Sequence, residues 1–145
     1  VCFVFSSRGR HTSLRCDWSS DVCLPIYVIV EDYAIVGGLS AVHQFCRLGK
    51  MSILGGCTKV VSDVAPFMMV DGNPARTRAV NKVGLERNGV AVEAQEALRR
   101  AHRLLFRKGL TTGNALGAIR TEVPQLDEVK HLVSFVETSD RGITR

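Results

Sequence analysis

Aliphatic residues recur at every sixth position through the middle of the chain, and this period constrains the fold more than any other feature. The series consists of Val30, Val36, Val42, Leu48, Leu54 and Val60. Four positions after each of them stands a small or β-branched residue, namely Ala34, Ser40, Cys46, Ser52, Thr58 and Val64. Such hexapeptide repeats are typical of a parallel β-helix, in which short strands point an aliphatic side chain inward and small residues fill the corners. Three hexads form one triangular coil, so the series predicts two coils.

The position directly after the aliphatic one holds glycine in three hexads and His43 in another. The glycines suit turns and close backbone packing, whereas the ring of His43 is expected to project outward. Cys46 occupies an inward small position. We interpret it as a core residue and not as a nucleophile, because no group near it in the sequence would lower the pKa of its thiol.

Composition limits the classes of protein that the chain can belong to. Its 145 residues are 46% hydrophobic, which suits one domain with a core, and no apolar run is long enough to span a bilayer. Five cysteines without a CxxC pair argue against a disulfide framework or a zinc site and favour a reducing compartment. Thirteen of the nineteen Lys and Arg residues lie in 73–145. This favours an acidic partner at that half, with a solvated basic face as the alternative.

The first 26 residues differ from the rest of the chain. They are rich in serine, hold three of the five cysteines and show no sustained period. Arginines follow the short apolar start, which is the reverse of a signal peptide. The stretch "DWSSDVC" (17–23) reads as the translation of a sequencing-library adapter. We therefore interpret residues 1–26 as an artefact, with a disordered natural N-terminus as the alternative.

Beyond the hexads the periodicity changes. "APFMMVDGNPA" (65–75) contains two prolines and a glycine, and predicts an irregular exit from the β-helix. Helical periods then predict helices over 77–87, 92–108, 112–119 and 125–136, the third of them capped by Thr111 or Thr112. The predicted organisation is thus 1–26 outside the fold, 27–72 as the hexapeptide-repeat end of a β-helix with its exit loop, and 73–145 as a helical C-terminal domain.

Three stretches resemble a known family. "IVGGLSAVHQF" (35–45), "GGCTKVVSDVAPFMMVDGNPA" (55–75) and "VNKVGLERNG" (80–89) look like the C-terminal half of the UDP-N-acetylglucosamine 3-O-acyltransferases. The resemblance implies a left-handed parallel β-helix, of which only the last two coils are present, followed by a small α-helical C-terminal domain. It also implies a cytoplasmic homotrimer without cofactor, metal, nucleic-acid partner or membrane span.

The activity that the resemblance implies is the first acylation of lipid A biosynthesis. An R-3-hydroxyacyl chain moves from acyl carrier protein to the 3-hydroxyl of UDP-N-acetylglucosamine. This chemistry needs a base that takes the proton of the sugar hydroxyl, and a donor for the oxyanion. In the family the base histidine lies on an earlier coil, and the position of a supporting histidine corresponds to Tyr27. We therefore expect no catalytic base in this chain, and no activity of the chain alone.

Substrate-binding roles follow from the resemblance for five residues: His43, Gln44, Gly56, Asn81 and Arg87. His43 and its neighbour help to shape the site around the acyl and sugar groups, while Arg87 offers the fixed donors that suit a diphosphate. Gly56 leaves room for a long acyl chain, unless it is a turn glycine. Val83 and Asn88 depart from an acidic residue and a second arginine that some members carry.

The basic half of the chain provides the candidate docking surface for the acidic acyl carrier protein. Five cations gather along one predicted helix and its end: Arg99, Arg100, Arg103, Arg107 and Lys108.

Two alternatives share the hexads. One is another β-helix enzyme, such as the N-acyltransferase of the same pathway or a γ-type carbonic anhydrase, which would need three zinc histidines where these coils hold only His43. The other is a non-catalytic scaffold.

Overall fold

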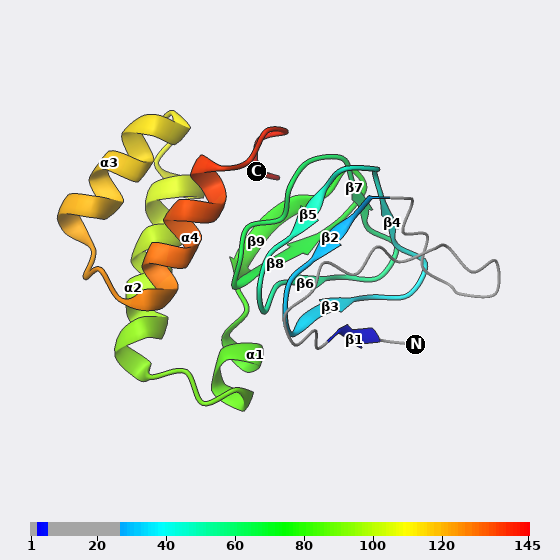
Figure 1. Ribbon diagram of the computed structural model, residues 1–145, viewed down its shortest axis with the longest axis horizontal. Helices are drawn as coiled ribbons and strands as arrows, with labels where there is room; N and C mark the ends of the chain where they lie inside the picture. Colours follow the sequence, from blue (N-terminus) through cyan, green and yellow to red (C-terminus); the bar gives the residue numbers. More distant parts are fainter. Residues whose placement is uncertain (1–2, 6–26) are drawn as a thin grey trace.

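The structure is a computed structural model that describes residues 3–5 and 27–145 (Figure 1). The interpretation of residues 1–26 as an artefact or a disordered segment falls outside the described residues, except for strand β1 (Phe3–Phe5), and stays a prediction. The later strands are β2 (Ile29–Val30), β3 (Ala34–Val36), β4 (Ala41–Val42), β5 (Arg47–Leu48), β6 (Ile53–Leu54), β7 (Lys59–Val60), β8 (Met68–Asp71) and β9 (Arg76–Val80). Among the described residues they form three sheets, in the orders β1-β3-β6-β8-β9, β2-β5 and β4-β7.

The register of the strands confirms a parallel β-helix. On each of three faces a strand pairs in parallel with the strand eighteen residues later, as in Ile29↔Arg47, Ile35↔Ile53 and Ala41↔Lys59. Eighteen residues are three hexads, so each hexad supplies one face of a coil. The inward positions are as predicted. The aliphatic residues from Val36 to Val60 in the series are at most 3% exposed, and the small residues of the second series are at most 2% exposed.

Residues with a left-handed backbone mark the corners of the coils. Six non-glycine residues, again spaced by six, have φ between 52° and 69°: Tyr27, Tyr33, Leu39, Phe45, Met51 and Cys57. For an L-residue this conformation costs roughly 1–2 kcal/mol, and the stacking of the coils supports it. Tyr27 and Phe45, which occupy the same corner in successive coils, stack with ring centroids 5.5 Å apart.

The glycines of the repeat serve close packing and not left-handed turns. A Cβ at Gly37 would lie 2.7 Å from the backbone N of Gly56, and a Cβ at Gly49 would lie 2.5 Å from the backbone N of Pro66. Neither glycine has a positive φ. Glycine therefore does not supply the left-handed corner positions, although Gly56 lies in a turn, and the prediction of close backbone packing is confirmed.

The stretch predicted as an irregular exit continues the β-helix. Strand β8 pairs in parallel with β6, but the spacing in Ile53↔Met69 is sixteen residues, because the coil is two residues shorter between Val60 and Val64. Strand β9 then returns antiparallel to β8. The helix predicted to start at Thr77 is therefore wrong in its first half. Pairing with β8 overrides the local helical pattern, and the helix begins only after Asn81.

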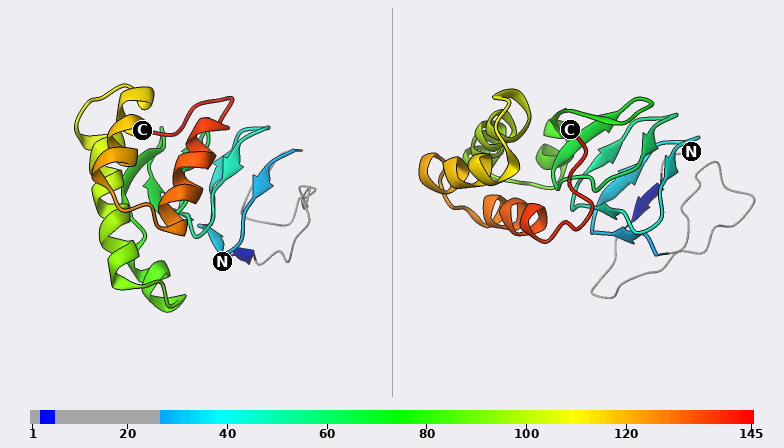
Figure 2. Two further views of the ribbon diagram at one scale, coloured as in Figure 1. Left: turned by 60° about the vertical axis from the view of Figure 1, so that its left-hand side comes forward. Right: turned by 90° about the horizontal axis from the view of Figure 1, so that it is seen from above.

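The C-terminal half is helical, with α1 (Lys82–Arg87), α2 (Val92–His102), η1 (Arg103–Arg107), α3 (Thr112–Glu122) and α4 (Asp127–Glu137). The helix predicted over 92–108 is present, but its last turns widen into the π-helix η1. Thr111 caps α3 by accepting from the backbone N–H of Asn114. Figure 2 shows α2, α3 and α4 grouped on one side of the β-helix. Among the described residues no helix is sufficiently long and apolar to cross a membrane.

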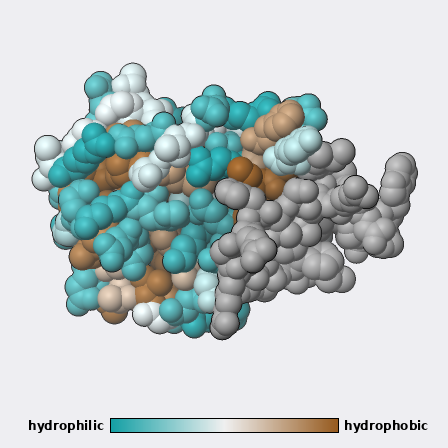
Figure 3. Space-filling view, in the orientation of Figure 1, coloured by the Kyte–Doolittle hydropathy of each residue, from teal (hydrophilic) through white to brown (hydrophobic). Residues whose placement is uncertain are grey.

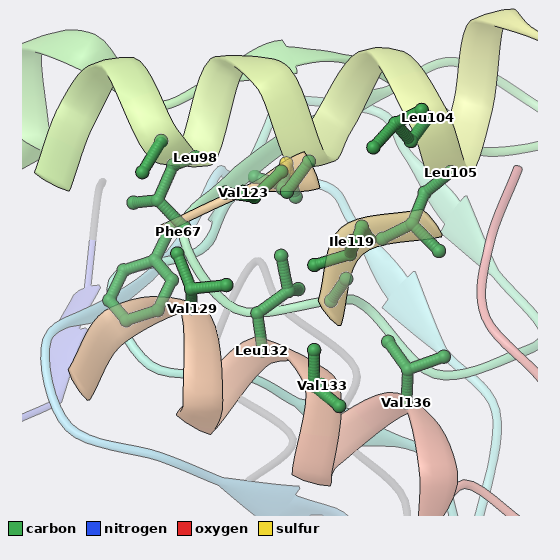
Figure 4. Packing of buried hydrophobic residues seen from close by; sticks show 14 of the residues in the cluster. Phe67, Leu98, Leu104, Leu105, Ile119, Val123, Val129, Leu132, Val133 and Val136 are labelled. Carbon is green, nitrogen blue, oxygen red and sulfur yellow. The ribbon is translucent and has the colours of Figure 1, made fainter. Parts of the chain in front are cut away.

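One core cluster joins the two halves of the molecule. Leu98 of α2, Ile119 of α3 and Leu132 of α4 are fully buried, and their side chains face one another between the helices (Figure 4). Phe67, from the segment that leads into β8, is also buried in this cluster (Figure 4). Each such side chain contributes about 1.5–3 kcal/mol through burial. The helices are therefore fixed against the last coil.

Candidate functional site

His43 and Gln44 lie directly after β4, on the outside of the β-helix. Both are exposed, as the sequence predicts for His43. The backbone N–H of His43 donates to the carbonyl of Val60 at 2.8 Å, which ties this position to the next coil. Nδ1 of His43 lies 3.0 Å from the carbonyl oxygen of Gln44. With the proton on Nδ1, the ring donates to that carbonyl and Nε2 remains as an acceptor.

Asn81 lies at the junction between the β-helix and α1. Its side chain is buried; Nδ2–H donates to the carbonyl of Met51 at 2.8 Å, and Oδ1 accepts from the backbone N–H of Gly84 at 3.0 Å. The amide therefore caps α1 and joins it to a corner of the β-helix. A role of Asn81 toward substrate stays a prediction, and these contacts give it a structural role in addition.

Arg87 is exposed in the last turn of α1. The next residue, Asn88, ends the helix, since its Nδ2–H donates to the carbonyl of Gly84 at 2.7 Å. Val83, four residues before Arg87 in the same helix, is 56% exposed. Figure 1 draws β4 and α1 on different sides of the β-helix, so this chain does not by itself bring Arg87 beside His43.

Gly56 is exposed beside the corner residue Cys57. Its φ is not positive, and a Cβ built on it would have ordinary contact, 3.4 Å, with the carbonyl oxygen of Gly38. The fold therefore does not require glycine at this position. Gly56 lies in a turn, and the interpretation that its missing side chain leaves room for a ligand stays a prediction.

The five cations of the predicted docking surface lie on α2, on η1 and directly after it, and all are exposed. Arg100, Arg103 and Lys108 converge on a pocket of about 120 Å³, which Glu122 also lines. Arg107 instead donates from Nη2 to the carbonyl of Arg78 at 3.1 Å. The space-filling view shows hydrophilic residues over much of the helical side, interrupted by smaller hydrophobic patches (Figure 3).

The sequence did not predict a polar cluster between the β-helix and α4. Oε2 of Glu31 lies 2.8 Å from Nε2 of His131 and accepts from the backbone N–H of Lys50 at 2.8 Å. The other carboxylate oxygen, Oε1, lies 3.6 Å from Nη2 of Arg47. Burial raises the pKa of Glu31, but the hydrogen bonds from His131 and Lys50 and the charges of His131 and Arg47 outweigh it, and the pKa is lowered. Glu31 and His131 are one hundred residues apart in the sequence, and no periodicity marks their contact.

The buried groups whose pKa values are shifted include Cys46 and His102. Burial raises the pKa of the Cys46 thiol, which confirms Cys46 as a core residue. His102, on α2, has its pKa lowered by burial and by the charge of Arg107, and its Nε2 has no hydrogen-bond partner among the described residues. Neither group is positioned as a nucleophile or a base.

The comparisons with known proteins agree with this fold. The family described as UDP-N-acetylglucosamine O-acyltransferase, domain 2, matches residues 63–144. An acyl-[acyl-carrier-protein]–UDP-N-acetylglucosamine O-acyltransferase of Myxococcus xanthus is 43% identical over 118 residues, which are 81% of this chain and 46% of that protein. The enzyme of the same name from Pseudomonas syringae is 41% identical over 137 residues, which are 94% of this chain and 52% of that protein.

Solved structures give the same result. The UDP-N-acetylglucosamine acyltransferase of Bacteroides fragilis superposes with a TM-score of 0.85 at 31% identity, over 87% of this chain and 49% of that one. The enzyme from Arabidopsis superposes with a TM-score of 0.78 at 32% identity, over 87% of this chain and 47% of that one. The fold is thus that of a hexapeptide-repeat β-helix with a helical C-terminal region. The chain belongs to the UDP-N-acetylglucosamine O-acyltransferase family, and it spans about half the length of the relatives that it matches.

Proposed function

We propose that this chain is the C-terminal part of an enzyme that transfers an R-3-hydroxyacyl group from acyl carrier protein to the 3-hydroxyl of UDP-N-acetylglucosamine, the first step of lipid A biosynthesis. The observation that carries the proposal is the 43% identity to an enzyme of that name over 81% of the chain. The β-helix with its helical C-terminal region supports it, since solved acyltransferases share this arrangement.

The architecture follows from the same relationship. The eighteen-residue coils are proposed to be the last two of a left-handed β-helix, and the molecule is proposed to be a cytoplasmic homotrimer. Within one chain β4 and α1 lie apart (Figure 1). A substrate that contacts both His43 and Arg87 would therefore lie between neighbouring subunits.

The proposed roles divide by position. The general base would belong to a preceding coil, and His43 would act on the reacting groups as a supporting residue, together with Gln44. Arg87 would bind the diphosphate, for which an exposed guanidinium at the end of a short helix is well suited. Gly56 would border the acyl chain, since its exposed backbone leaves space on the surface.

Acyl carrier protein is proposed to dock on the basic surface of α2 and η1. Three of its cations converge on one pocket, and a positive surface accelerates association with an acidic partner. The residues proposed to dock it are Arg99, Arg100, Arg103, Arg107 and Lys108.

The test requires a full-length enzyme, in which the preceding coils of the family are joined to residues 28–145 of this chain. Incubated with R-3-hydroxyacyl-acyl carrier protein, it should convert UDP-N-acetylglucosamine into an ester and release the carrier thiol in equal amount. A matched reaction offers a 3-O-acylated UDP-glucosamine, whose free amine would accept the chain as an amide. Amide formation alone would assign the chain to the N-acyltransferase class, and no transfer to either acceptor would leave a non-catalytic scaffold.

A further inference from the structure

Gln44 is held by a residue from the far end of the chain. Nη1 of Arg141 donates to the carbonyl oxygen of Gln44 at 2.9 Å, across ninety-seven residues of sequence. The same oxygen lies 3.0 Å from Nδ1 of His43. A backbone carbonyl has two lone pairs and can accept both hydrogen bonds. One oxygen thus joins a guanidinium to the ring of the histidine in the candidate site.

The segment that carries Arg141 is anchored on both sides of it. Before it, Oγ of Ser139 donates to Oδ2 of Asp63 at 2.7 Å. After it, the backbone N–H of Asp63 donates to the carbonyl of Gly142 at 2.9 Å, and the backbone N–H of Thr144 donates to the carbonyl of Asp63 at 2.7 Å. Figures 1 and 2 show this C-terminal segment returning from α4 to the β-helix. Arg141 therefore starts from a fixed backbone.

The anchor also explains the reach of the arginine. Asp63 is 1% exposed and lies beside Arg47 of the preceding coil, since Leu48 pairs with Val64 and the backbone N–H of Arg47 donates to Oδ1 of Asp63 at 2.8 Å. Neighbouring strands of a sheet are about 4.8 Å apart, which an arginine side chain readily spans. From the coil of Asp63, Arg141 thus reaches back to Gln44, three residues before Arg47.

We infer that Arg141 is a positioning residue of the acyltransferase site. Its charged donor fixes the Gln44 carbonyl in place, so that His43 keeps its proton on Nδ1 and leaves Nε2 available to the substrate. Hydrogen bonds from an ionised donor are shorter and stronger than neutral ones, and the bond made by one ring nitrogen sets the state of the other. The effect on catalysis rests on the proposed function, whereas the effect on the ring does not.

The first test measures the ring itself in the 145-residue chain. Long-range ¹H–¹⁵N spectra at about pH 8.5, two units above the ordinary imidazole pKa of about 6.5, report which nitrogen of His43 carries the proton. The native chain should show mainly the Nδ1–H form. Arg141→Met should shift His43 toward the mixture of a free imidazole, while Arg141→Lys, which keeps a charged donor, should retain the native form.

The matched control is Arg145→Met, which removes another arginine of the same tail. Arg145 also donates to a backbone carbonyl, that of Leu110, at 3.2 Å, but it does not contact Gln44. The substitution Arg145→Met should therefore leave the spectrum of His43 unchanged. The dispersion of the backbone amide signals in the NMR spectrum shows whether each variant is folded. If Arg141→Met unfolds, Arg141→Gln is measured in its place. A native Nδ1–H population in Arg141→Met and Arg141→Gln, or an equal shift in Arg145→Met, overturns the inference.

The second test uses the full-length enzyme. Arg141→Met should lower kcat roughly tenfold and leave the KM for the nucleotide sugar near its original value, and Arg141→Lys should restore most of the rate. Normal kcat in Arg141→Met would refute the positioning role. An inactive parent enzyme would refute the proposed function instead, and the ring measurement would still decide the contact between Arg141 and His43.

Discussion

Gly49 lies at a close approach between two coils of the β-helix. A Cβ at this position would lie 2.5 Å from the backbone N of Pro66. Because this is a backbone atom, it cannot turn away as the end of a flexible side chain could. Gly56 differs, since a Cβ there has ordinary contact with Gly38. The two glycines share the repeat and an ordinary φ, so their difference isolates the effect of close backbone packing.

We expect Gly49→Ala to destabilise the fold by about 1–3 kcal/mol, the usual effect of overpacking. Gly56→Ala should change the free energy of unfolding by less than about 1 kcal/mol, and in the stabilising direction, because alanine restricts the unfolded chain. Chemical denaturation of both variants measures the difference. Equal destabilisation of the two variants would show that the approach of Pro66 to Gly49 does not limit this position.

At the scale of the elements, the repeat made the β-helix predictable because each hexad shows the same inward pattern locally. Strand β8 was missed because the coil shortens by two residues between Val60 and Val64, which breaks the period of six while the pairing with β6 continues. Strand β9 was missed because its pairing with β8 is a tertiary contact that overrides a helical pattern. The left-handed corners carry no common residue type, so composition could not mark them.

The candidate site was predictable to the same extent. The exposure of His43 follows from its place after an inward aliphatic residue. The buried amide of Asn81 does not follow from the repeat, because it depends on the carbonyl of Met51, thirty residues away. The contacts of Glu31 with His131 and of Arg141 with Gln44 join still more distant segments. Local sequence patterns thus indicate which residues are exposed, and the return of the C-terminal half decides what they contact.

The Glu31–His131 contact joins the β-helix to α4, and it predicts how stability depends on pH. The pKa of Glu31 is lower in the folded chain than its ordinary value of 4.5. The unfolded chain therefore binds more protons in this range, and the contribution of Glu31 is present above pH 4.5 and lost as the pH falls through the folded pKa. Glu31→Gln should lower stability at neutral pH and reduce the loss on acidification.

Denaturation midpoints between about pH 3 and pH 7 measure this effect. The control is Glu137→Gln, which removes an exposed carboxylate that pairs with Arg120 and should keep the acid dependence of the parent, because exposed pairs contribute little. If the Glu31→Gln and parent curves run parallel across the whole range, Glu31 does not contribute to the acid dependence.

At the scale of the whole molecule, positive charge is concentrated at the helical side. Arg100 and Arg103 line the same pocket, whereas Arg120 lies on α3 and pairs with Glu137. We expect Arg100→Glu/Arg103→Glu in the full-length enzyme to raise the KM for acyl carrier protein at least tenfold and to flatten its dependence on salt. The KM for the nucleotide sugar should stay nearly constant.

Arg120→Glu serves as the control for net charge, because it reverses an exposed cation outside the docking surface. Initial rates at several concentrations of acyl carrier protein and of salt measure both effects. An equal rise of KM in Arg120→Glu would indicate a general effect of net charge, and unchanged kinetics in the double variant would leave α2 and η1 as a solvated face.

Arg87 and His43 belong to distant parts of one chain, and the proposal that they serve one site predicts different kinetic effects. If Arg87 binds the diphosphate equally in the ground state and the transition state, Arg87→Ala should raise the KM for the nucleotide sugar and leave kcat near normal. One charge-assisted hydrogen bond is worth about 1.5–3 kcal/mol, or roughly a ten- to hundredfold change in affinity. Lys82→Ala, on the same helix, removes a cation that pairs with Glu86 and should have little effect.

His43→Ala should lower kcat with a smaller effect on KM, because it disturbs the arrangement of the reacting groups. It should not abolish turnover, since the proposed base lies on a preceding coil. Steady-state kinetics of the full-length enzyme separate the two patterns, and the oligomeric state of each variant is checked in parallel. An intact but completely inactive His43→Ala enzyme would instead identify His43 as the base, and the positioning effect of Arg141 would then act directly on the residue that takes the proton.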